Sequence, residues 1–165
     1  MSDIHGCLDA FLDALSLVDL EDKNNKLVLC GDYIHGGSDS YAVVEKIIEL
    51  KKKYKSKVVV LMGNHEHWVI EQGMPIVDEY RDEGEYDEKR ENKCIDFISQ
   101  MELYYDGCSH YYIDGDALKN GVVLVLMYDT DAKKFYEVTE LENKELKHTN
   151  KNKKNTKWLM MYKNK

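Results

Sequence analysis

Two short apolar runs, each followed by a glycine and polar side chains, constrain the fold of this chain most strongly. Residues 27–30 read Leu-Val-Leu-Cys before Gly31, and residues 58–62 read Val-Val-Val-Leu-Met before Gly63. Runs of this length that end at glycine are typical of buried strands. Amphipathic helix patterns precede and separate them, over residues 7–19 and 39–53. The alternation predicts βαβ units with a largely parallel sheet.

Beyond the single proline, Pro75, the apolar periodicity weakens before it returns. It then predicts a third helix over residues 92–103 and strands over residues 110–114, 122–128 and 135–138. A strand-rich end beside a βαβ front indicates two sheets or one mixed sheet. We therefore predict one α/β domain over residues 1–140, followed by a lysine-rich tail over residues 141–165.

The composition excludes several classes of protein. With 165 residues, of which 43% are apolar and 33% charged, the chain can bury a core. It has no apolar run long enough to span a membrane. The net charge of −8 argues against nucleic-acid binding. Because no basic segment precedes an apolar stretch at the N-terminus, we expect a cytoplasmic protein with free cysteine thiols, and its oligomeric state is left open.

Side chains that can bind metal ions lie just past the predicted strand ends and at the start of the chain. They are, in chain order, Asp3, His5, Asp32, Asn64 and His65. Because ligands of open α/β sheets bind beyond the carboxyl ends of the strands, we expect these side chains at one rim. Carboxylate, imidazole and amide groups suit ions such as Mn, Fe, Zn or Co. A carboxylate that bridges two ions is the arrangement of two-metal phosphoryl hydrolysis.

Three segments together carry a resemblance to a known family. They read Ser2-Asp3-Ile4-His5-Gly6, Gly31-Asp32-Tyr33-Ile34-His35-Gly36-Gly37 and Gly63-Asn64-His65-Glu66. In this order they resemble the first three motifs of the calcineurin-like metallophosphoesterases, and within that superfamily the bacterial serine/threonine protein phosphatases. The resemblance covers residues 1–66 well and residues 67–105 poorly. The strands predicted after residue 110 resemble the closing strands of the family.

The resemblance implies a fold, a cofactor and a role for each motif residue. The fold would be an incomplete form of the family's αββα sandwich, with mixed β-sheets flanked by helices. Two divalent ions, with Mn expected first, would be held by Asp3, His5, Asp32 and Asn64, and Asp32 would bridge them. His65 would protonate the leaving oxygen. The substrate would be a phosphorylated protein or a small phosphoester.

The second motif departs from the family pattern. Where the family usually continues with Asp-Arg-Gly, this chain has His35-Gly36-Gly37. The usual aspartate supports the general-acid histidine, and the usual arginine grips the substrate phosphate through two hydrogen bonds. We expect His35 to take a related polar role in catalysis, whereas Gly36 offers only backbone. The chain has two arginines in all, Arg81 and Arg90, and no phosphate-binding side chain is assigned.

Two further departures concern segments that the family has and this chain does not show. The family has a strand before its first motif, but only two residues precede Asp3 here. This predicts weaker preorganisation of Asp3 and His5 and an exposed strand edge. The family's later histidine motifs complete the second metal site, whereas His67 and His110 lie in other contexts. The chain is interpreted as a truncated or internally deleted member whose second metal site is incomplete.

The sequence leaves three functions open. The first is a metal-dependent phosphoesterase that resembles serine/threonine protein phosphatases and needs neither nucleic acid nor a membrane. The second is a non-catalytic remnant that binds a metal ion or a protein. The third is a dinucleoside-polyphosphate hydrolase or phosphodiesterase of the same superfamily. The Gly31-Asp32-Tyr33 segment favours the first.

Overall fold

The computed structural model describes residues 1–77, 85–103, 117–123, 125–138 and 143–145. Its helices are α1 (Leu8–Ser16), α2 (Ser40–Tyr54), α3 (Asn64–Gln72), α4 (Glu88–Ile98) and α5 (Ala117–Asn120), with a 3-10 turn, η1, at Lys55–Lys57. Its strands are β1 (Leu27–Leu29), β2 (Val58–Met62), β3 (Glu102–Leu103), β4 (Val125–Asp129), β5 (Lys134–Val138) and β6 (Asn143–Glu145).

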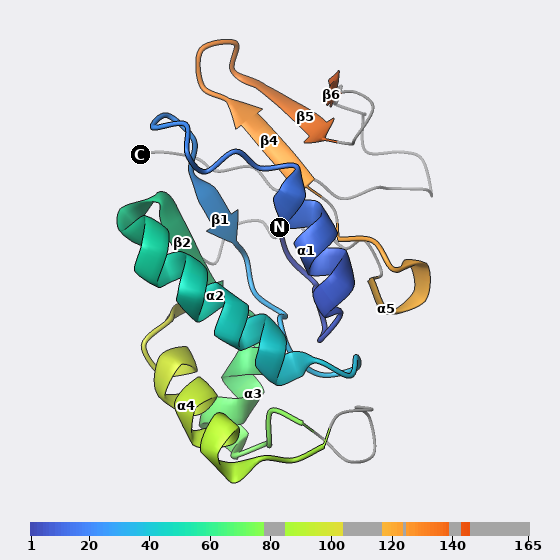
Figure 1. Ribbon diagram of the computed structural model, residues 1–165, viewed down its shortest axis with the longest axis vertical. Helices are drawn as coiled ribbons and strands as arrows, with labels where there is room; N and C mark the ends of the chain where they lie inside the picture. Colours follow the sequence, from blue (N-terminus) through green and yellow to red (C-terminus); the bar gives the residue numbers. More distant parts are fainter. Residues whose placement is uncertain (78–84, 104–116, 124, 139–142, 146–165) are drawn as a thin grey trace.

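The described strands form two separate sheets. The first is parallel, in the order β1-β2-β3, and pairs Leu27 with Val58 and Leu61 with Glu102. The second is antiparallel, in the order β4-β5-β6. Helix α2 packs on β2 and also contacts α1 and α4, and Figure 1 shows α3 and α4 at the end of the molecule away from the β4–β5 hairpin. The predicted α/β class is confirmed, with two sheets rather than one mixed sheet.

The parallel sheet is buried on one face more than on the other. Leu27, Leu29 and Val58 are buried, whereas Val28 and Val59 between them are 38% and 36% exposed. The apolar runs therefore predicted the strands correctly but not their half-exposed pattern, because Val and Leu at every position conceal the alternation of inward and outward side chains.

Helix α4 is displaced from the predicted span of 92–103. It begins after Asp87, whose carboxylate accepts a hydrogen bond from the backbone N–H of Arg90 at 3.0 Å, as N-cap side chains do. It ends at Ile98, and the chain then forms β3 beside β2. The predicted span was wrong at both ends. The helix starts earlier because Asp87 caps it, and it stops earlier because residues 102–103 pair with β2 instead of continuing the helix.

Helix α3 was not predicted, because its residues are mostly polar and follow a glycine. The strands predicted over 122–128 and 135–138 correspond to β4 and β5. The strand predicted over 110–114 lies outside the described residues. Strand β6 falls at the start of the segment predicted as a tail, and the remainder of that segment also lies outside the described residues.

Three cysteines, Cys7, Cys30 and Cys94, are free thiols, and Cys108 lies outside the described residues. Burial raises the pKa of the Cys94 thiol to about 12, so it stays protonated inside the core. In the described part of the chain, no helix has the length and apolar character needed to cross a membrane.

Candidate metal centre

Backbone hydrogen bonds join the first two motifs. The N–H groups of Ile4 and His5 donate to the carbonyl of Asp32 at 2.8 and 3.0 Å. The N–H of Gly6 donates to the carbonyl of Tyr33 at 2.8 Å. The first motif is therefore held beside the segment that follows β1 without being part of a strand. The expected weaker preorganisation of Asp3 and His5 stays a prediction.

Two glycines allow the second and third motifs to come into contact. A Cβ on Gly31 would lie 2.4 Å from the Cα of Gly63, and a Cβ on Gly63 would lie 2.3 Å from Oδ1 of Asp32. Gly31 also has a φ of +102°, which other residues rarely adopt. Only glycine at both positions permits this approach, so these two residues bring the ends of β1 and β2 together.

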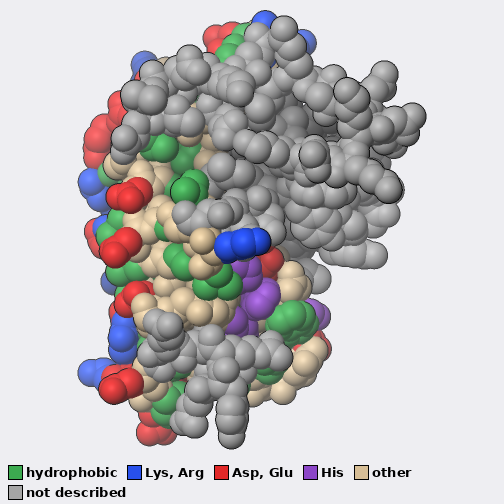
Figure 2. All heavy atoms as spheres, turned by 90° about the vertical axis from the view of Figure 1, so that its right-hand side faces the viewer, with side chains coloured by type: hydrophobic (Ala, Val, Ile, Leu, Met, Phe, Trp, Pro, Cys, Tyr) green, Lys and Arg blue, Asp and Glu red, His purple; other side chains and the backbone are tan. Residues whose placement is uncertain are grey.

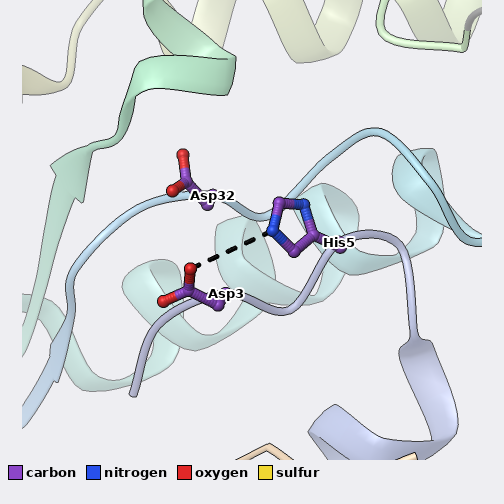
Figure 3. A group of neighbouring side chains, drawn as sticks. All are labelled: Asp3, His5 and Asp32. Carbon is purple, nitrogen blue, oxygen red and sulfur yellow. Dashed lines mark ion pairs between the residues drawn. The ribbon is translucent and has the colours of Figure 1, made fainter. Parts of the chain in front are cut away.

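Asp3, His5 and Asp32 converge at this point (Figure 3). Each offers one ligand atom, and the three atoms lie within 4.8 Å of one another. The Nε2 atom of His5 lies 4.0 Å from Oδ1 of Asp3. All three side chains are half-buried. Two carboxylates and one imidazole at this spacing fit the ligand set of a first-row divalent cation.

The ring of His5 is oriented for metal binding. Its Nδ1 atom lies 3.1 Å from the carbonyl oxygen of His35 and 3.2 Å from that of Ile34. Because a carbonyl oxygen only accepts hydrogen bonds, Nδ1 carries the proton and Nε2 carries the lone pair. Metal-binding histidines are commonly fixed in this way by a backbone carbonyl. The lone pair of His5 is therefore on the nitrogen that is nearer to Asp3.

The backbone around the site is strained. Six described residues other than glycine have positive φ, and four of them are Asp3, His5, Asp32 and His35. Their φ angles lie between 48° and 68°, a region that costs roughly 1–2 kcal/mol per residue. Such residues cluster at functional sites, where the surrounding contacts hold them in place. Here the strain coincides with the residues that the motifs identified.

The buried carboxylate of Glu66 joins the second and third motif loops, and no role was predicted for this residue from the sequence. Its buried carboxylate accepts backbone N–H bonds from Asp32 and Tyr33, both at 2.8 Å, and from Gly63 at 2.9 Å. Burial, together with the neighbouring carboxylate of Asp32, raises the pKa of Glu66 to about 7. Its place in the third motif, directly after Gly63-Asn64-His65, was the signal that could have identified it.

Asn64 and His65, at the start of α3, face Asp32. With its nitrogen turned toward Asp32, the amide of the exposed Asn64 side chain donates to Oδ2 at 3.1 Å and Oδ1 at 3.3 Å. The backbone N–H of His65 donates to Oδ1 of Asp32 at 3.1 Å. The ring of His65 lies 4.7 Å from that of His5 and 4.6 Å from that of Trp68, between centroids. Histidine side chains gather accordingly on one face of the molecule (Figure 2).

The sequence profile of the calcineurin-like phosphoesterases matches residues 1–162. The chain belongs to this family. The match extends over the central residues that resembled the family poorly and over most of the lysine-rich end. The serine/threonine phosphatase branch is not distinguished by this match.

Several curated proteins each match this chain over 66 residues. A symmetrical bis(5'-nucleosyl)-tetraphosphatase of Wigglesworthia glossinidia brevipalpis is 38% identical over that length, which is 40% of this chain and 23% of the relative. Proteins of the same name from Buchnera aphidicola and Legionella pneumophila (strain Lens) are each 36% identical over 66 residues, again 40% of this chain, and 23% and 22% of the relatives. The match thus spans about a quarter of each relative. No solved structure matches the chain.

The family's phosphate-binding arginine has no substitute among the described residues of the second motif. Gly36 stands at the position of that arginine; it has a φ of +118°, and a Cβ there would lie 2.6 Å from the side chain of Leu118 in α5.

The other candidate basic residues do not replace this arginine in the described part of the chain. The guanidinium of Arg90 pairs with Glu45 at 2.8 Å. Arg81 and His110 lie outside the described residues. His67 belongs to α3.

Proposed function

We propose that this chain is a metal-dependent hydrolase of phosphate esters and anhydrides, with nucleoside polyphosphates as its first candidate substrates. The convergence of Asp3, His5 and Asp32 within 4.8 Å is the observation that carries the proposal. It agrees with the membership of the chain in the calcineurin-like phosphoesterase family. A non-catalytic remnant would have no need to keep four strained residues at this place.

The residues divide into two groups by what each can do. Asp3, His5 and Asp32 would hold one divalent ion. Asp32 and Asn64, whose amide lies beside the carboxylate of Asp32, would hold a second ion. A bound ion supplies Lewis acidity and a lowered pKa of its water, which makes that water a nucleophile near neutral pH. Mn²⁺ is the first ion to test, followed by Fe²⁺, Zn²⁺ and Co²⁺.

His65 is proposed as the general acid. Its ring stands beside that of His5, so it can reach a leaving oxygen on a phosphate bound in front of Asp3 and Asp32. A protonated His65 would donate its proton to that oxygen as the bond to phosphorus breaks. The exposed position of Asn64 at the start of α3 leaves this side of the site accessible to a substrate.

Nucleoside polyphosphates are preferred as substrates because the curated relatives are named symmetrical bis(5'-nucleosyl)-tetraphosphatases. Phosphorylated proteins are the second candidate, favoured by the resemblance of the segment from Gly31 to Gly37 to bacterial serine/threonine phosphatases. Because the chain has a net charge of −8, electrostatic repulsion opposes the approach of either anionic substrate. A cytoplasmic location remains a prediction that suits either substrate.

The test is hydrolysis by the Mn²⁺-loaded chain of diadenosine tetraphosphate, a phosphoserine peptide and p-nitrophenyl phosphate. We expect diadenosine tetraphosphate to be cleaved with water into two molecules of ADP, at a rate that Asp32→Asn lowers by at least about 100-fold. Asp13→Asn, an exposed carboxylate on α1, is the charge-matched control and should retain the rate. Release of phosphate from the peptide alone would favour the second candidate. If no substrate turns over faster with the original chain than with Asp32→Asn, the hydrolase proposal is wrong.

A further inference from the structure

We propose that His35 is a positioning residue: its neutral ring accepts a hydrogen bond from the ring of His65 and thereby fixes the tautomer of His65. The proton of His35 is itself placed by the carbonyl of Pro75. The residue thus stands where the family has an aspartate, but it acts through geometry rather than through negative charge. The inference deepens the proposed role of His65 and rests on it only for its effect on turnover.

The ring of His35 has two hydrogen-bond partners, one on each nitrogen. Its Nε2 atom lies 2.8 Å from the carbonyl oxygen of Pro75. Its Nδ1 atom lies 3.0 Å from Nδ1 of His65. The residue is only 3% exposed, and its backbone N–H donates to Oγ of Ser40 at 3.1 Å. His35 cannot itself contact a substrate, so any effect on the reaction passes through His65.

These two contacts determine where the protons lie. The carbonyl of Pro75 only accepts, so Nε2 of His35 must carry the proton. In the neutral ring, Nδ1 of His35 is then the acceptor, and the facing Nδ1 of His65 must donate. The neutral ring of His65 consequently carries its lone pair on Nε2. The opposite tautomer would place two lone pairs 3.0 Å apart and lose the hydrogen bond.

One rigid peptide group sets this order of protons. The carbonyl of Pro75 and the N–H of Ile76 belong to the same planar peptide bond, whose two groups point in opposite directions. The carbonyl faces His35, while the N–H donates to the carboxylate of Glu91 at 3.0 and 3.3 Å. Glu91 is 6% exposed and also accepts from the hydroxyl of Tyr41 at 2.8 Å. Helix α4 therefore anchors the peptide that orients His35.

The chemical consequence concerns the nitrogen that handles the substrate proton. Because Nδ1 of His65 is committed to His35, Nε2 is the atom that takes up a proton and delivers it to a leaving oxygen. An aspartate at position 35 would fix the same tautomer with a charged acceptor. A residue without an acceptor would release the ring to rotate and to exchange tautomers.

The direct test is ¹⁵N NMR of histidine in the full-length, metal-free chain at about pH 8, where exposed histidines are neutral. We expect the proton of His35 on Nε2 and that of His65 on Nδ1. In His35→Phe, which keeps a ring but no acceptor, the His65 signals should shift toward the Nε2-protonated form. His35→Asp should restore the Nδ1-protonated form, and His67→Gln, elsewhere on α3, should leave His65 unchanged. A wild-type protein with His65 protonated on Nε2 overturns the proposal without any variant.

Turnover gives a second, separate result. With a substrate that the chain hydrolyses, His35→Phe should lower kcat by about 10–100-fold and leave KM within about twofold, as loss of an orienting partner does. His35→Asp should recover most of the loss. If the tautomers are as expected but no substrate turns over, the proposed function is wrong, while the role of His35 in fixing the tautomer of His65 stands. Equal kcat in His35→Phe and the original chain would limit His35 to a structural part and overturn its role in the reaction.

Discussion

The motif loops and the Pro75 loop, residues 73–77 after α3, are held in different ways. The three motif loops meet through backbone hydrogen bonds, through the carboxylate of Glu66, and at two glycines where an added Cβ would clash with the neighbouring loop. The Pro75 loop reaches the same site through single side chains, with Glu91 on one side of its peptide bond and His35 on the other. The motif loops are thus held mainly through their own backbone, whereas the Pro75 loop is held by the side chains of residues distant in the sequence.

The difference explains why the family's motifs are easy to recognise by eye in one region and not in the other. Backbone contacts at Gly31 and Gly63 tolerate no other residue, so the sequence there is recognisable. Any residue can supply a backbone carbonyl oxygen such as that of Pro75. Only the side chain that holds this peptide in place, Glu91, is specified by the sequence. The contacts of Glu91 thus support the site from residues in which no family motif was recognised.

The largest effect should come from filling the contact between the motif loops. Gly31→Ala adds a Cβ 2.4 Å from Gly63 at a φ of +102°, and overpacking together with backbone strain should cost about 3–5 kcal/mol of unfolding free energy. Gly73→Ala is the matched control, since its φ is also positive, +66°, but no atom lies within 4 Å. It should cost about 1–2 kcal/mol. Equal urea midpoints for the two variants would contradict the close approach.

The next effect should come from Glu91. Glu91→Ala leaves the N–H of Ile76 and the hydroxyl of Tyr41 without their acceptor in the core, which should cost about 2–4 kcal/mol of unfolding free energy. Burial and the hydrogen bond to Glu91 raise the pKa of the Tyr41 hydroxyl, so it remains a donor. Glu88→Ala, an exposed residue on the same helix, should cost less than about 1 kcal/mol. Equal melting temperatures for Glu91→Ala and Glu88→Ala would contradict the role of Glu91 as a buried acceptor for Ile76 and Tyr41.

The smallest effect should come from the ion pairs that join α2 to α4. Burial alone would raise the pKa of Glu45, but the hydrogen bonds from Arg90 and Lys93 outweigh it and lower that pKa. The stabilisation from Glu45 is therefore complete above its ordinary pKa near 4.5 and is lost as the pH falls through the lower folded value. Glu45→Gln should lower the unfolding free energy by roughly 0.5–1 kcal/mol at neutral pH.

The pH dependence and a matched pair check this expectation. The difference between Glu45→Gln and the original chain should shrink as urea unfolding is followed from neutral pH to below the ordinary pKa of the carboxyl. Glu49→Gln removes a partner of Lys46 at 3.0 Å, but that side chain is 63% exposed, so it should change stability by less than about 0.5 kcal/mol. A difference for Glu45→Gln that grows on acidification would reverse the assigned sign.

The sequence predicted most of what local patterns can specify. Apolar runs and helical periodicity located β1, β2, α1 and α2 to within a few residues. The rim of metal-binding residues followed from the strand ends, and Asp3, His5 and Asp32 do converge there. These successes share a cause, since short-range periodicity and the topology of parallel strands together fix where strand ends meet.

What the sequence could not predict depends on contacts between distant residues. Glu91 is one of many acids in this chain, and nothing in its spacing shows that it is a buried acceptor. The support of His35 by Pro75 joins residues 40 positions apart. The short strand β3 formed inside a predicted helix because pairing with β2 outweighed local periodicity.

The most direct test of the central claim is a calorimetric titration of the full chain with Mn²⁺. If Asp3, His5 and Asp32 form a metal site, the original chain should bind at least one ion per molecule. Asp32→Asn should weaken that binding by at least about 10-fold, and Asp13→Asn, an exposed carboxylate on α1, should bind as the original does. Equal affinity in Asp32→Asn and Asp13→Asn, or no binding by the original chain, would contradict the account.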